Sequence, residues 1–337
     1  MEIKIFKGKD FYKAVSYKSE NLKLWIVIHS TKLGPALGGC RMLKVDNSFS
    51  ALKHVALLSK AMTYKNAVVD LPFGGGKTLI YDWNPNVPRE TLLLEFSNLL
   101  NSLKGEYMTA DDVNTSVKDM EFMRNYTPYA RGVYYKGTQI PATSYGVCMA
   151  IKAAAKEVLH TDSLDNINIF IQGLGKVGYN FAKMLRAENA NVYVYDINKD
   201  IMNKCIEELD CIPSDPNGMF SNKIDILSPC ALGNTINDDT VHMFKAKVIA
   251  GGANNQLQSR KLDNVLFDRG ITYIPDFLCN SGGVIDVDCE GINYCPDYVY
   301  KRVGIIYDKS TDFLKKAKEN KTSVLTVAED YVLNKLK

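Results

Sequence analysis

The segment Ile169-Phe-Ile-Gln-Gly173-Leu-Gly175-Lys-Val-Gly178 joins an apolar run to three glycines with the spacing Gly-x-Gly-x-x-Gly. The apolar run predicts a strand, and the residues after Gly175 predict a helix. Asp196 ends the next apolar run, eighteen residues after Gly178. Such glycines let a pyrophosphate reach the helix N-terminus, and an aspartate at this distance can bind ribose hydroxyls. The segment therefore predicts a dinucleotide-binding site, and the negative charge of Asp196 favours NAD over NADP.

Strand and helix patterns alternate around this segment. Helices are expected at about 143–160, after Gly175 and after Asn198. Apolar runs that predict strands lie at 167–171, 192–195, 224–227 and 248–250. Such alternation is typical of a parallel sheet with helices on both faces. We therefore predict a Rossmann-like, doubly wound domain over residues 142–290.

The N-terminal third carries an α/β pattern of its own, and we assign it to a separate domain over residues 1–135. Ser48 is expected to cap a helix that ends near Lys65. The glycines at 74–76 predict a turn, which would place Lys77 at the start of a strand. Asp111 and Asp112 lie in the loop between a predicted strand and the next helix.

The remaining segments complete a two-domain α/β fold. Residues 131–141 carry two glycines and a proline between periodic segments, which predicts an interdomain hinge. Residues 291–337 are charge-rich and helical in pattern. We expect these C-terminal helices to pack back on the first domain.

Composition narrows the classes of function. The chain has 337 residues, 46% of them hydrophobic, and a net charge of 41 − 38 = +3 without a basic block, so a nucleic-acid partner is not expected. The sequence has no apolar leader and no membrane-length apolar run, which indicates a soluble, cytoplasmic protein. The eight cysteines form no Cys-x-x-Cys pair and the four histidines are dispersed, so we expect reduced thiols and no metal site.

Two lysines, Lys65 and Lys77, are candidates to bind a small anion. Most lysines are solvated, but Lys77 lies between three glycines and the apolar run 78–81, where a solvated charge is not expected. Burial beside a second cation favours the neutral form of a lysine, which can act as a base. For Asp111 and Asp112 the competing interpretation is helix capping, which we expect for one of them.

The Gly76-Lys77-Thr78 triplet also matches the end of a nucleotide-triphosphate loop. That loop needs a glycine five residues before Gly76, and this position is Leu71. It must also open a helix, whereas the residues after Lys77 predict a strand. A kinase or ATPase is therefore disfavoured.

Taken together, the motifs resemble the amino-acid dehydrogenase family of glutamate, leucine, valine and phenylalanine dehydrogenases, and most closely its leucine dehydrogenase branch. The resemblance runs almost from end to end of the chain. Besides the dinucleotide loop, it rests on Gly34-Pro-Ala-Leu-Gly-Gly-Cys-Arg-Met42, Met62-Thr-Tyr-Lys65, Gly74-Gly-Gly-Lys77, Thr109-Ala-Asp-Asp-Val113, Ser228-Pro-Cys-Ala-Leu-Gly233, Ala253-Asn-Asn-Gln-Leu257 and Asn280-Ser-Gly-Gly-Val284.

The resemblance implies oxidative deamination of an L-amino acid by NAD, which gives a 2-oxo acid and ammonia, and the reverse reductive amination. Lys77 would be the general base that activates water, and Asp112 would exchange a proton with the amino group. Lys65 would hold the substrate carboxylate together with the backbone of Gly38 and Gly39. The other implied substrate-binding residues are Met62, Leu37, Ala110, Asn254, Val284 and Val287.

The resemblance also implies a set of cofactor-binding residues and an assembly. NAD would be bound by Gly173, Gly175, Lys176, Val177, Gly178, Asp196, Ile197, Thr143, Cys230, Ala231, Asn254 and Asn255. The family forms symmetric oligomers, often through the N-terminal domain, so a homo-oligomer, a dimer or an octamer, is expected.

Substrate choice follows from four apolar positions. The resemblance implies a side-chain pocket lined by Leu37, Ala110, Val284 and Val287. Such a pocket has no partner for the second carboxylate of glutamate, which favours a branched aliphatic substrate. An aromatic substrate, phenylalanine or tryptophan, and a non-catalytic NAD-binding homologue stay open as alternatives. A 2-hydroxy-acid dehydrogenase is disfavoured because no histidine has a recognisable acid–base partner.

Four features depart from the family pattern. Asn114 stands in place of a usual glycine, Ser281 in place of an alanine and Asp286 in place of an asparagine, and the hinge is short. These changes leave the implied catalytic residues intact and bear on substrate identity and efficiency.

Overall fold

The chain forms two compact units in the computed structural model, which describes residues 2–133, 140–291 and 293–337. Unit 1 takes in Met1–Gln139, Asp286–Cys295 and Val332–Lys337. Unit 2 takes in Ile140–Ile285 and Pro296–Tyr331. Of the predicted hinge, residues 134–139 lie outside the described part of the chain.

Unit 1 is built on a mixed sheet with the strand order β1-β2-β3-β5-β4-β6. Each neighbouring pair among the first four strands in this order is antiparallel, and β4 runs parallel to both β5 and β6. The strands span Glu2–Phe6, Lys13–Lys18, Leu22–Ser30, Ala36–Met42, Gly74–Trp83 and Tyr107–Asp111 for β1 to β6.

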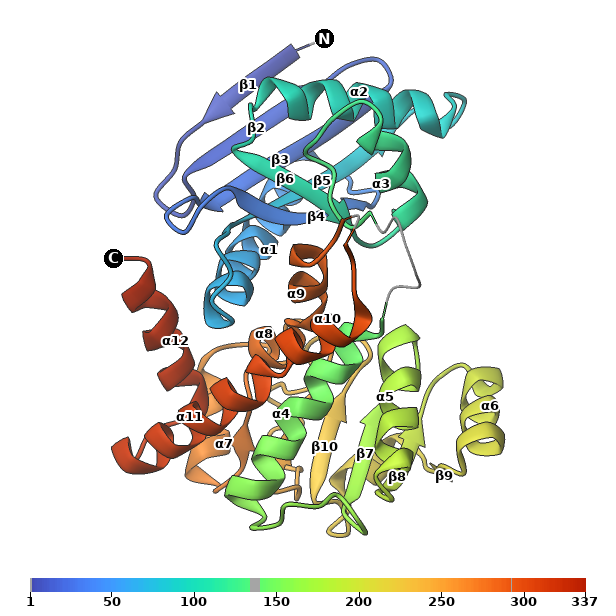
Figure 1. Ribbon diagram of the computed structural model, residues 1–337, viewed down its shortest axis with the longest axis vertical. Helices are drawn as coiled ribbons and strands as arrows, with labels where there is room; N and C mark the ends of the chain where they lie inside the picture. The colour runs from blue at the N-terminus through green and yellow to red at the C-terminus, as the bar shows by residue number, and fades with distance from the viewer. Residues whose placement is uncertain (1, 134–139, 292) are drawn as a thin grey trace. The chain divides into compact units, whose positions relative to one another are not determined.

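Helices cover both faces of this sheet (Figure 1). Side chains alternate between the faces of a strand, so Leu24 and Ile26 of β3 join one apolar cluster and Trp25 joins the other. The first cluster includes Phe96 of helix α2, and the second includes Val55 of helix α1. The helices of this layer system are α1 (Ser48–Val68), α2 (Arg89–Ser102) and α3 (Val117–Arg124).

The prediction of a turn at the triple glycine is wrong, because β5 begins at Gly74. These glycines instead allow close packing over the strand. A Cβ on Gly75 would collide with Thr63 of helix α1, and one on Gly76 would lie 2.7 Å from the ring of Tyr107. Lys77 therefore lies inside a central strand and not at the rim of a loop.

Polar side chains cap the N-termini of two helices in unit 1. The cap of α1 is one residue earlier than predicted, because the Asn47 side chain accepts hydrogen bonds from the backbone N–H groups of Phe49 and Ser50. Helix α3 begins with a capping box, in which Ser116 and Asp119 are each bonded to the backbone of the other.

Unit 2 contains a fully parallel sheet with the order β12-β11-β10-β7-β8-β9. Numbered from its own first strand, this order is 6-5-4-1-2-3, the arrangement of dinucleotide-binding folds. The chain reverses its direction of winding between β7 and β10, and such a switch point opens a crevice at the carboxyl ends of the strands. The strands span Asn168–Gln172, Asn191–Tyr195, Ile212–Pro213, Ile226–Pro229, Val248–Ile249 and Thr272–Tyr273 for β7 to β12.

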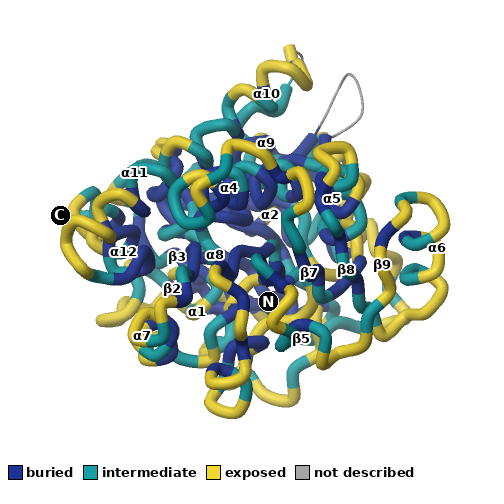
Figure 2. The backbone as a smooth tube through the Cα atoms, turned by 90° about the horizontal axis from the view of Figure 1, so that it is seen from below, coloured by how far each residue is buried: buried dark blue, intermediate teal, exposed yellow. Residues whose placement is uncertain are grey.

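Helices flank this sheet as the alternating pattern predicts. Figure 2 shows strand β7 as mainly buried, strand β8 as alternating between buried and half-buried residues, and helix α6 as mainly exposed. The helices are α4 (Ala142–Val158), α5 (Lys176–Ala187), α6 (Lys199–Leu209), the 3-10 helix η1 (Pro216–Phe220), α7 (Lys261–Asp268), α8 (Asp276–Cys279), α9 (Gly282–Asp288), α10 (Pro296–Val303), α11 (Ile305–Asn320) and α12 (Val324–Lys335).

The segment 291–337, which was expected to pack on the first domain, is divided between the two units. Helices α10 and α11 pack against α4 and belong to unit 2, together with the start of α12, whereas Asp286–Cys295 and Val332–Lys337 belong to unit 1. The physical reason is the apolar face of α11, which buries Ile306 and Phe313. Among the described residues, none of the helices combines the length and apolar character needed to cross a membrane.

Candidate active site

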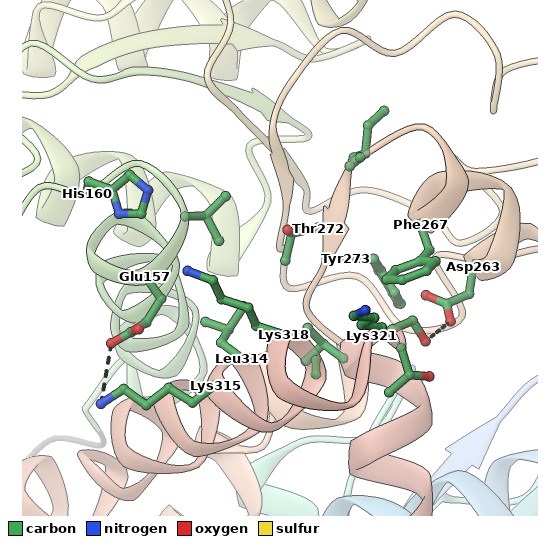
Figure 3. A pocket seen from close by; sticks show the side chains of 17 residues that line it. Glu157, His160, Asp263, Phe267, Thr272, Tyr273, Leu314, Lys315, Lys318 and Lys321 are labelled. Carbon is green, nitrogen blue, oxygen red and sulfur yellow. Dashed lines mark hydrogen bonds and ion pairs between the residues drawn. The ribbon is translucent and has the colours of Figure 1, made fainter.

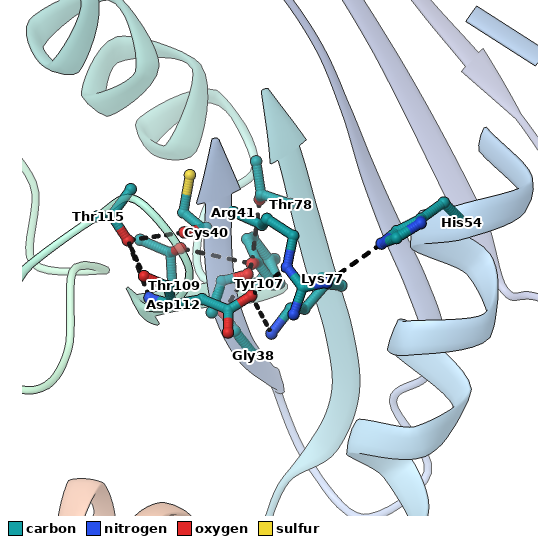
Figure 4. Close-up of polar contacts among 11 residues, drawn as sticks. Gly38, Cys40, Arg41, His54, Lys77, Thr78, Tyr107, Thr109, Asp112 and Thr115 are labelled. Carbon is teal, nitrogen blue, oxygen red and sulfur yellow. Dashed lines mark hydrogen bonds and ion pairs between the residues drawn. The ribbon is translucent and has the colours of Figure 1, made fainter. Parts of the chain in front are cut away.

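Lys77, Arg41 and Asp112 meet on one face of the unit 1 sheet (Figure 4). The Oδ2 atom of Asp112 lies 3.1 Å from Nζ of Lys77 and accepts a 2.9 Å hydrogen bond from Nε of Arg41. Strand register explains the meeting, because Cys40 pairs with Thr78 on one side and with Asp111 on the other. Arg41, Lys77 and Asp112 are the sequence neighbours of these three paired residues. Because side chains alternate along a strand, all three lie on the face opposite to that of Cys40.

Charge and burial fix the protonation state of Asp112. Burial alone would raise the pKa of its carboxyl group, but Lys77 and Arg41 outweigh burial and lower the pKa to about 2. The side chain of Lys77 is only 8% exposed and that of Arg41 17%, so solvent screens their attraction weakly. Asp112 is a carboxylate at neutral pH.

The backbone around Asp112 is held by the Thr115 hydroxyl group. This oxygen accepts a hydrogen bond from the Asp112 N–H at 2.8 Å and donates one to the Cys40 carbonyl at 2.7 Å. Asn114 has a φ of 60°, which explains why glycine is usual there and why asparagine is tolerated. Its side-chain amide donates to the Met42 carbonyl at 3.0 Å.

Gly38 and Gly39 form the floor beside these charged groups. A Cβ on Gly39 would lie 3.2 Å from Nζ of Lys77 and 2.8 Å from Cβ of Asp112. A Cβ on Gly38 would strike the Gly76 carbonyl and lie 3.2 Å from Cγ of Met62. The structure thus brings together the predicted residues Lys77, Asp112, Gly38, Gly39 and Met62.

The other predicted substrate residues lie at different places in the chain. Lys65 is in the last turn of α1, one turn after Met62. Leu37 of β4 and Ala110 of β6 are buried in neighbouring strands of unit 1. Val287 belongs to unit 1, whereas Val284 and Asn254 belong to unit 2. Their contribution to one substrate pocket stays a prediction.

Sequence analysis missed Arg41 as a site residue, although it lies in the Gly34–Met42 motif. The alternation of side chains along β4 could have placed it on the same face as Gly39. Its Nη1 atom also lies 3.2 Å from Nε2 of His54 on α1. Burial and then Arg41 lower the pKa of His54, which leaves its imidazole neutral at pH 7.

The glycine loop of unit 2 has the shape that a pyrophosphate requires. Gly173 has a φ of +96°, and a Cβ there would lie 2.6 Å from Ala231. A Cβ on Gly178 would collide with the Gly173 carbonyl. The absence of a side chain at position 178 therefore lets helix α5 pack closely against the loop. A Cβ on Gly175 would meet nothing within 4 Å, and no side chain caps α5. Open space therefore adjoins the positive end of this helix.

Asp196 follows β8 at the same edge of the sheet. Its Oδ2 accepts a 2.6 Å hydrogen bond from the Leu174 N–H, and its Oδ1 accepts a 2.8 Å bond from the Asn198 N–H. These bonds fix the carboxylate and leave further lone pairs for ribose hydroxyls. The adjacent Ile197 is 89% exposed.

The other predicted cofactor residues follow neighbouring parallel strands. The Cys230 N–H donates to the Gln172 carbonyl at 2.7 Å, which holds the end of β10 beside that of β7. Asn280, a further residue that sequence analysis missed, donates from its side chain to Oδ1 of Asn254 at 2.8 Å. Asn255 has a φ of 53°, and Thr143 lies in the first turn of α4.

The remaining departures from the family pattern have local hydrogen-bond partners. The Ser281 hydroxyl donates to the Leu278 carbonyl at 2.7 Å. Asp286 is 1% exposed and accepts a 2.7 Å hydrogen bond from the Tyr294 hydroxyl. Both polar side chains are therefore compatible with burial.

Unit 2 also contains a cavity of about 450 Å³ near the start of β12 (Figure 3). Buried Tyr273 and Leu314 contribute apolar walls, and exposed Lys318 and Lys321 lie at its rim. All strands of this sheet are parallel, so the amino end of β12 is opposite the glycine loop. The cavity includes none of the predicted site residues. Over the described ranges, no three histidine, cysteine or acidic side chains are arranged to hold a metal ion.

Fold and site together define an α/β oxidoreductase of the amino-acid dehydrogenase class. The family model of the Glu/Leu/Phe/Val dehydrogenase dimerisation domain matches residues 9–129. That of the Glutamate/Leucine/Phenylalanine/Valine dehydrogenase domain matches 137–204 and 199–295. The chain belongs to this family and is an enzyme that acts on the CH–NH2 group of amino acids.

Individual relatives cover nearly the whole chain. Leucine dehydrogenase of Bacillus subtilis is 41% identical over 310 residues, which are 90% of this chain and 85% of the relative. The crystal structure of L-tryptophan dehydrogenase from Nostoc punctiforme matches with a TM-score of 0.84 and 33% identity, over 97% of this chain and 95% of that one. Hetero-hexameric glutamate dehydrogenase from Thermus thermophilus has a TM-score of 0.75 over 99% and 87%, and at 21% identity it supports the fold alone.

We expect the destabilisation caused by Asp112→Asn to depend on pH. The pKa of Asp112 in the folded protein is about 2, below its ordinary value of 3.8. A carboxyl group with a lowered pKa stabilises the folded state above its unfolded-state pKa, and this contribution is lost as the pH falls through the folded-state value. The free energy of unfolding of the variant should therefore differ most from that of the wild type above about pH 5 and least near pH 2.

Urea unfolding at several pH values measures this difference. The same substitution at exposed Asp46 is the matched control and should show a small effect at every pH. A difference for Asp112→Asn that stays constant from neutral to acid pH would show that the carboxylate is not held ionised by its two cations.

Proposed function

We propose that this enzyme catalyses the NAD-dependent oxidative deamination of a branched-chain aliphatic L-amino acid, with leucine foremost, and the reverse reductive amination. The observation that carries the proposal is the buried Lys77–Asp112 pair above the Gly38–Gly39 floor. The similarity to a leucine dehydrogenase at 41% identity supports the substrate class. Apolar Leu37 and Ala110 beside this floor support an aliphatic side chain over one that carries a second carboxylate.

In the proposed mechanism three charged side chains of unit 1 each have one role. Lys65, with the backbone of Gly38 and Gly39, holds the substrate carboxylate. Once the α-carbon has lost its hydride, Lys77 acts as the general base that takes a proton from water as the water adds to the C=N bond of the substrate. Asp112 exchanges a proton with the amino group that leaves as ammonia. NAD, when bound, supplies the oxidising power by accepting a hydride.

The proton exchange at Asp112 is coupled to the state of Lys77. While Lys77 is charged, it and Arg41 keep the pKa of Asp112 low, against the effect of burial. When Lys77 loses its proton, its share of this attraction disappears while that of Arg41 stays, so the affinity of Asp112 for a proton rises. A carboxylate that is a poor base beside charged Lys77 thereby becomes a useful one beside neutral Lys77.

The glycine loop and Asp196 are the residues that would hold NAD in unit 2. The open space beside Gly175 suits a pyrophosphate at the N-terminus of α5. Asp196 would accept hydrogen bonds from the ribose hydroxyls, and its charge would repel a ribose phosphate. Cys230, Ala231 and Asn254 follow neighbouring strands and would line the rest of the cofactor site.

Replacing Lys77 by alanine should lower kcat by about 1,000-fold or more, because it removes both the base and one cation that controls Asp112. NADH binding, followed by fluorescence, should stay within about twofold because the proposed cofactor residues are in the other unit. Exposed Lys60 of α1 provides the matched control, and Lys60→Ala should keep kcat unchanged. A Lys77→Ala enzyme with near-normal turnover would remove Lys77 from the mechanism.

A substrate panel tests the pocket. With NAD as acceptor, kcat/KM for leucine, valine and isoleucine should exceed that for glutamate by at least about tenfold, because an apolar site without a charged partner rejects a second carboxylate. Phenylalanine and tryptophan test the aromatic alternative. Lactate tests the 2-hydroxy-acid alternative and should give no reaction. A preference for aromatic substrates would keep the proposed mechanism and overturn the proposed pocket. NADH binding without any turnover would favour a non-catalytic homologue.

We further propose that the chain forms a homo-oligomer through the outer strand β1. This strand lies at the edge of the unit 1 sheet, where its outer backbone groups can pair with another strand. Ile3, Ile5 and Phe6 are 42%, 60% and 43% exposed, which is unusual for a row of large apolar side chains. The match of residues 9–129 to a dimerisation domain supports association through this unit.

Charge placed on this edge should weaken the assembly. Ile5→Lys should lower the molar mass measured by light scattering at a fixed protein concentration, because a lysine must be desolvated in the interface. Lys4→Gln, on the same strand, is the matched control and should leave the mass unchanged. If Ile5→Lys also keeps the wild-type mass, association through β1 is wrong.

A further inference from the structure

Two cysteine thiols meet at the end of helix α6, outside the sites described above. Sγ of Cys205 lies 3.6 Å from Sγ of Cys211. Cys205 is fully buried and Cys211 is 4% exposed. All residues of α6 are described, and Cys205 is the one that is buried. The helix is thus anchored to unit 2 at the position of this thiol.

Local backbone geometry sets this contact. Asp210 ends the helix in the left-handed conformation, with φ 53° and ψ 41°, and its N–H donates to the Ile206 carbonyl. In this type of helix ending, the residue after the left-handed one contacts a residue in the last turn but one. Cys211 and Cys205 occupy these two positions, where apolar side chains are usual. The thiols are therefore held together by the chain itself and not by distant packing.

Arg186 of helix α5 fixes the same turn from outside. Its Nε donates to the Leu209 carbonyl at 3.0 Å, and its Nη2 pairs with Oδ2 of Asp210 at 2.8 Å. The Asp210 side chain is 94% exposed, so the turn lies at the surface directly above the buried thiols. Transient opening of this last turn would admit a small molecule to the sulfur atoms.

We propose that Cys205 and Cys211 are a modification site at which a small hydroperoxide converts two thiols into an intramolecular disulfide. A disulfide has an S–S length of about 2.05 Å, so the sulfur atoms must approach by about 1.5 Å. Side-chain rotation in the open turn can provide this movement without a change elsewhere in the fold. The unmodified pair is the reduced form expected in a reducing compartment.

The two thiols differ in acidity, and the reaction requires one of them to be the more acidic. The hydrogen bond between the two sulfur atoms lowers the pKa of Cys205, and the same contact together with burial raises the pKa of Cys211. The Cys205 thiolate attacks one peroxide oxygen, breaks the O–O bond and becomes a sulfenic acid while the other oxygen leaves as water or alcohol. The sulfur of Cys211 then attacks the sulfenic sulfur, forms the S–S bond, loses its proton and releases water. Two thiols are oxidised by two electrons and one peroxide is reduced.

The sequence permits a direct test by mass spectrometry. Lys204 precedes Cys205, and the next lysine or arginine after it is Lys223, so trypsin places both cysteines in the single peptide 205–223. The intact protein is treated with hydrogen peroxide, denatured, alkylated and then digested. We expect this peptide to lose two hydrogens and take up no alkylating agent. Dithiothreitol added before alkylation should restore both alkylation sites.

Cys148 is the matched control within the same chain. It is a buried cysteine of α4, and burial raises its pKa to about 11. We expect peptide 205–223 to be oxidised at least tenfold faster than Cys148. Cys205→Ser and Cys211→Ser should each abolish the loss of two hydrogens, whereas Cys295→Ser, at an exposed cysteine, should preserve it. Far-ultraviolet circular dichroism before and after treatment verifies that the protein stays folded.

Three results would overturn the proposal. Both thiols of the peptide could stay open to alkylation while exposed Cys295 is oxidised, or Cys205 and Cys148 could react at equal rates. A disulfide that joins Cys205 or Cys211 to any other cysteine would contradict the proposed pair. None of these results depends on turnover, so the site is tested separately from the proposed reaction.

Discussion

The Asp112 carboxylate lies between Lys77 and Arg41, and this buried ion cluster constrains the rest of unit 1. Two cations on neighbouring strands would repel each other without the shared anion. The anion can reach both because the Asp112 backbone is bonded through Thr115 to β4, the strand that carries Arg41. Glycine at position 39 is required for the same reason, since any side chain there would enter the cluster.

The two parts of the fold differ in how far their sequences reveal them. The dinucleotide loop is local: strand, glycines and helix N-terminus follow one another in ten residues, so their spacing predicts the geometry. The lysine–aspartate cluster is assembled from three strands and depends on register. Arg41 was missed because nothing in its own neighbourhood indicates Asp112, which is 71 residues away. The strands β9 and β12, of two residues each, were not predicted.

The triple glycine shows why a residue type alone can mislead. Glycine is frequent in turns because it allows positive φ angles, and this is the property on which the prediction relied. Gly75 and Gly76 instead lie in a strand, where the absence of a side chain admits Thr63 on one side and Tyr107 on the other. The same chemical fact, a missing Cβ, serves backbone rotation in Gly173 and close packing in Gly75. Only the packed structure separates the two uses.

The charges of the cluster also favour the class of ligand that the enzyme handles. Lys77 and Arg41 contribute two positive charges and Asp112 one negative charge, which leaves an excess of one positive charge. His54 adds none at neutral pH, because its pKa is lowered by burial and by Arg41. An anion gains more than a neutral molecule from this excess, and the weak exposure of Lys77 limits screening by water and salt. In the proposed reaction, the carboxylate end of a zwitterionic amino acid would be favoured by the same arrangement that controls the proton on Asp112.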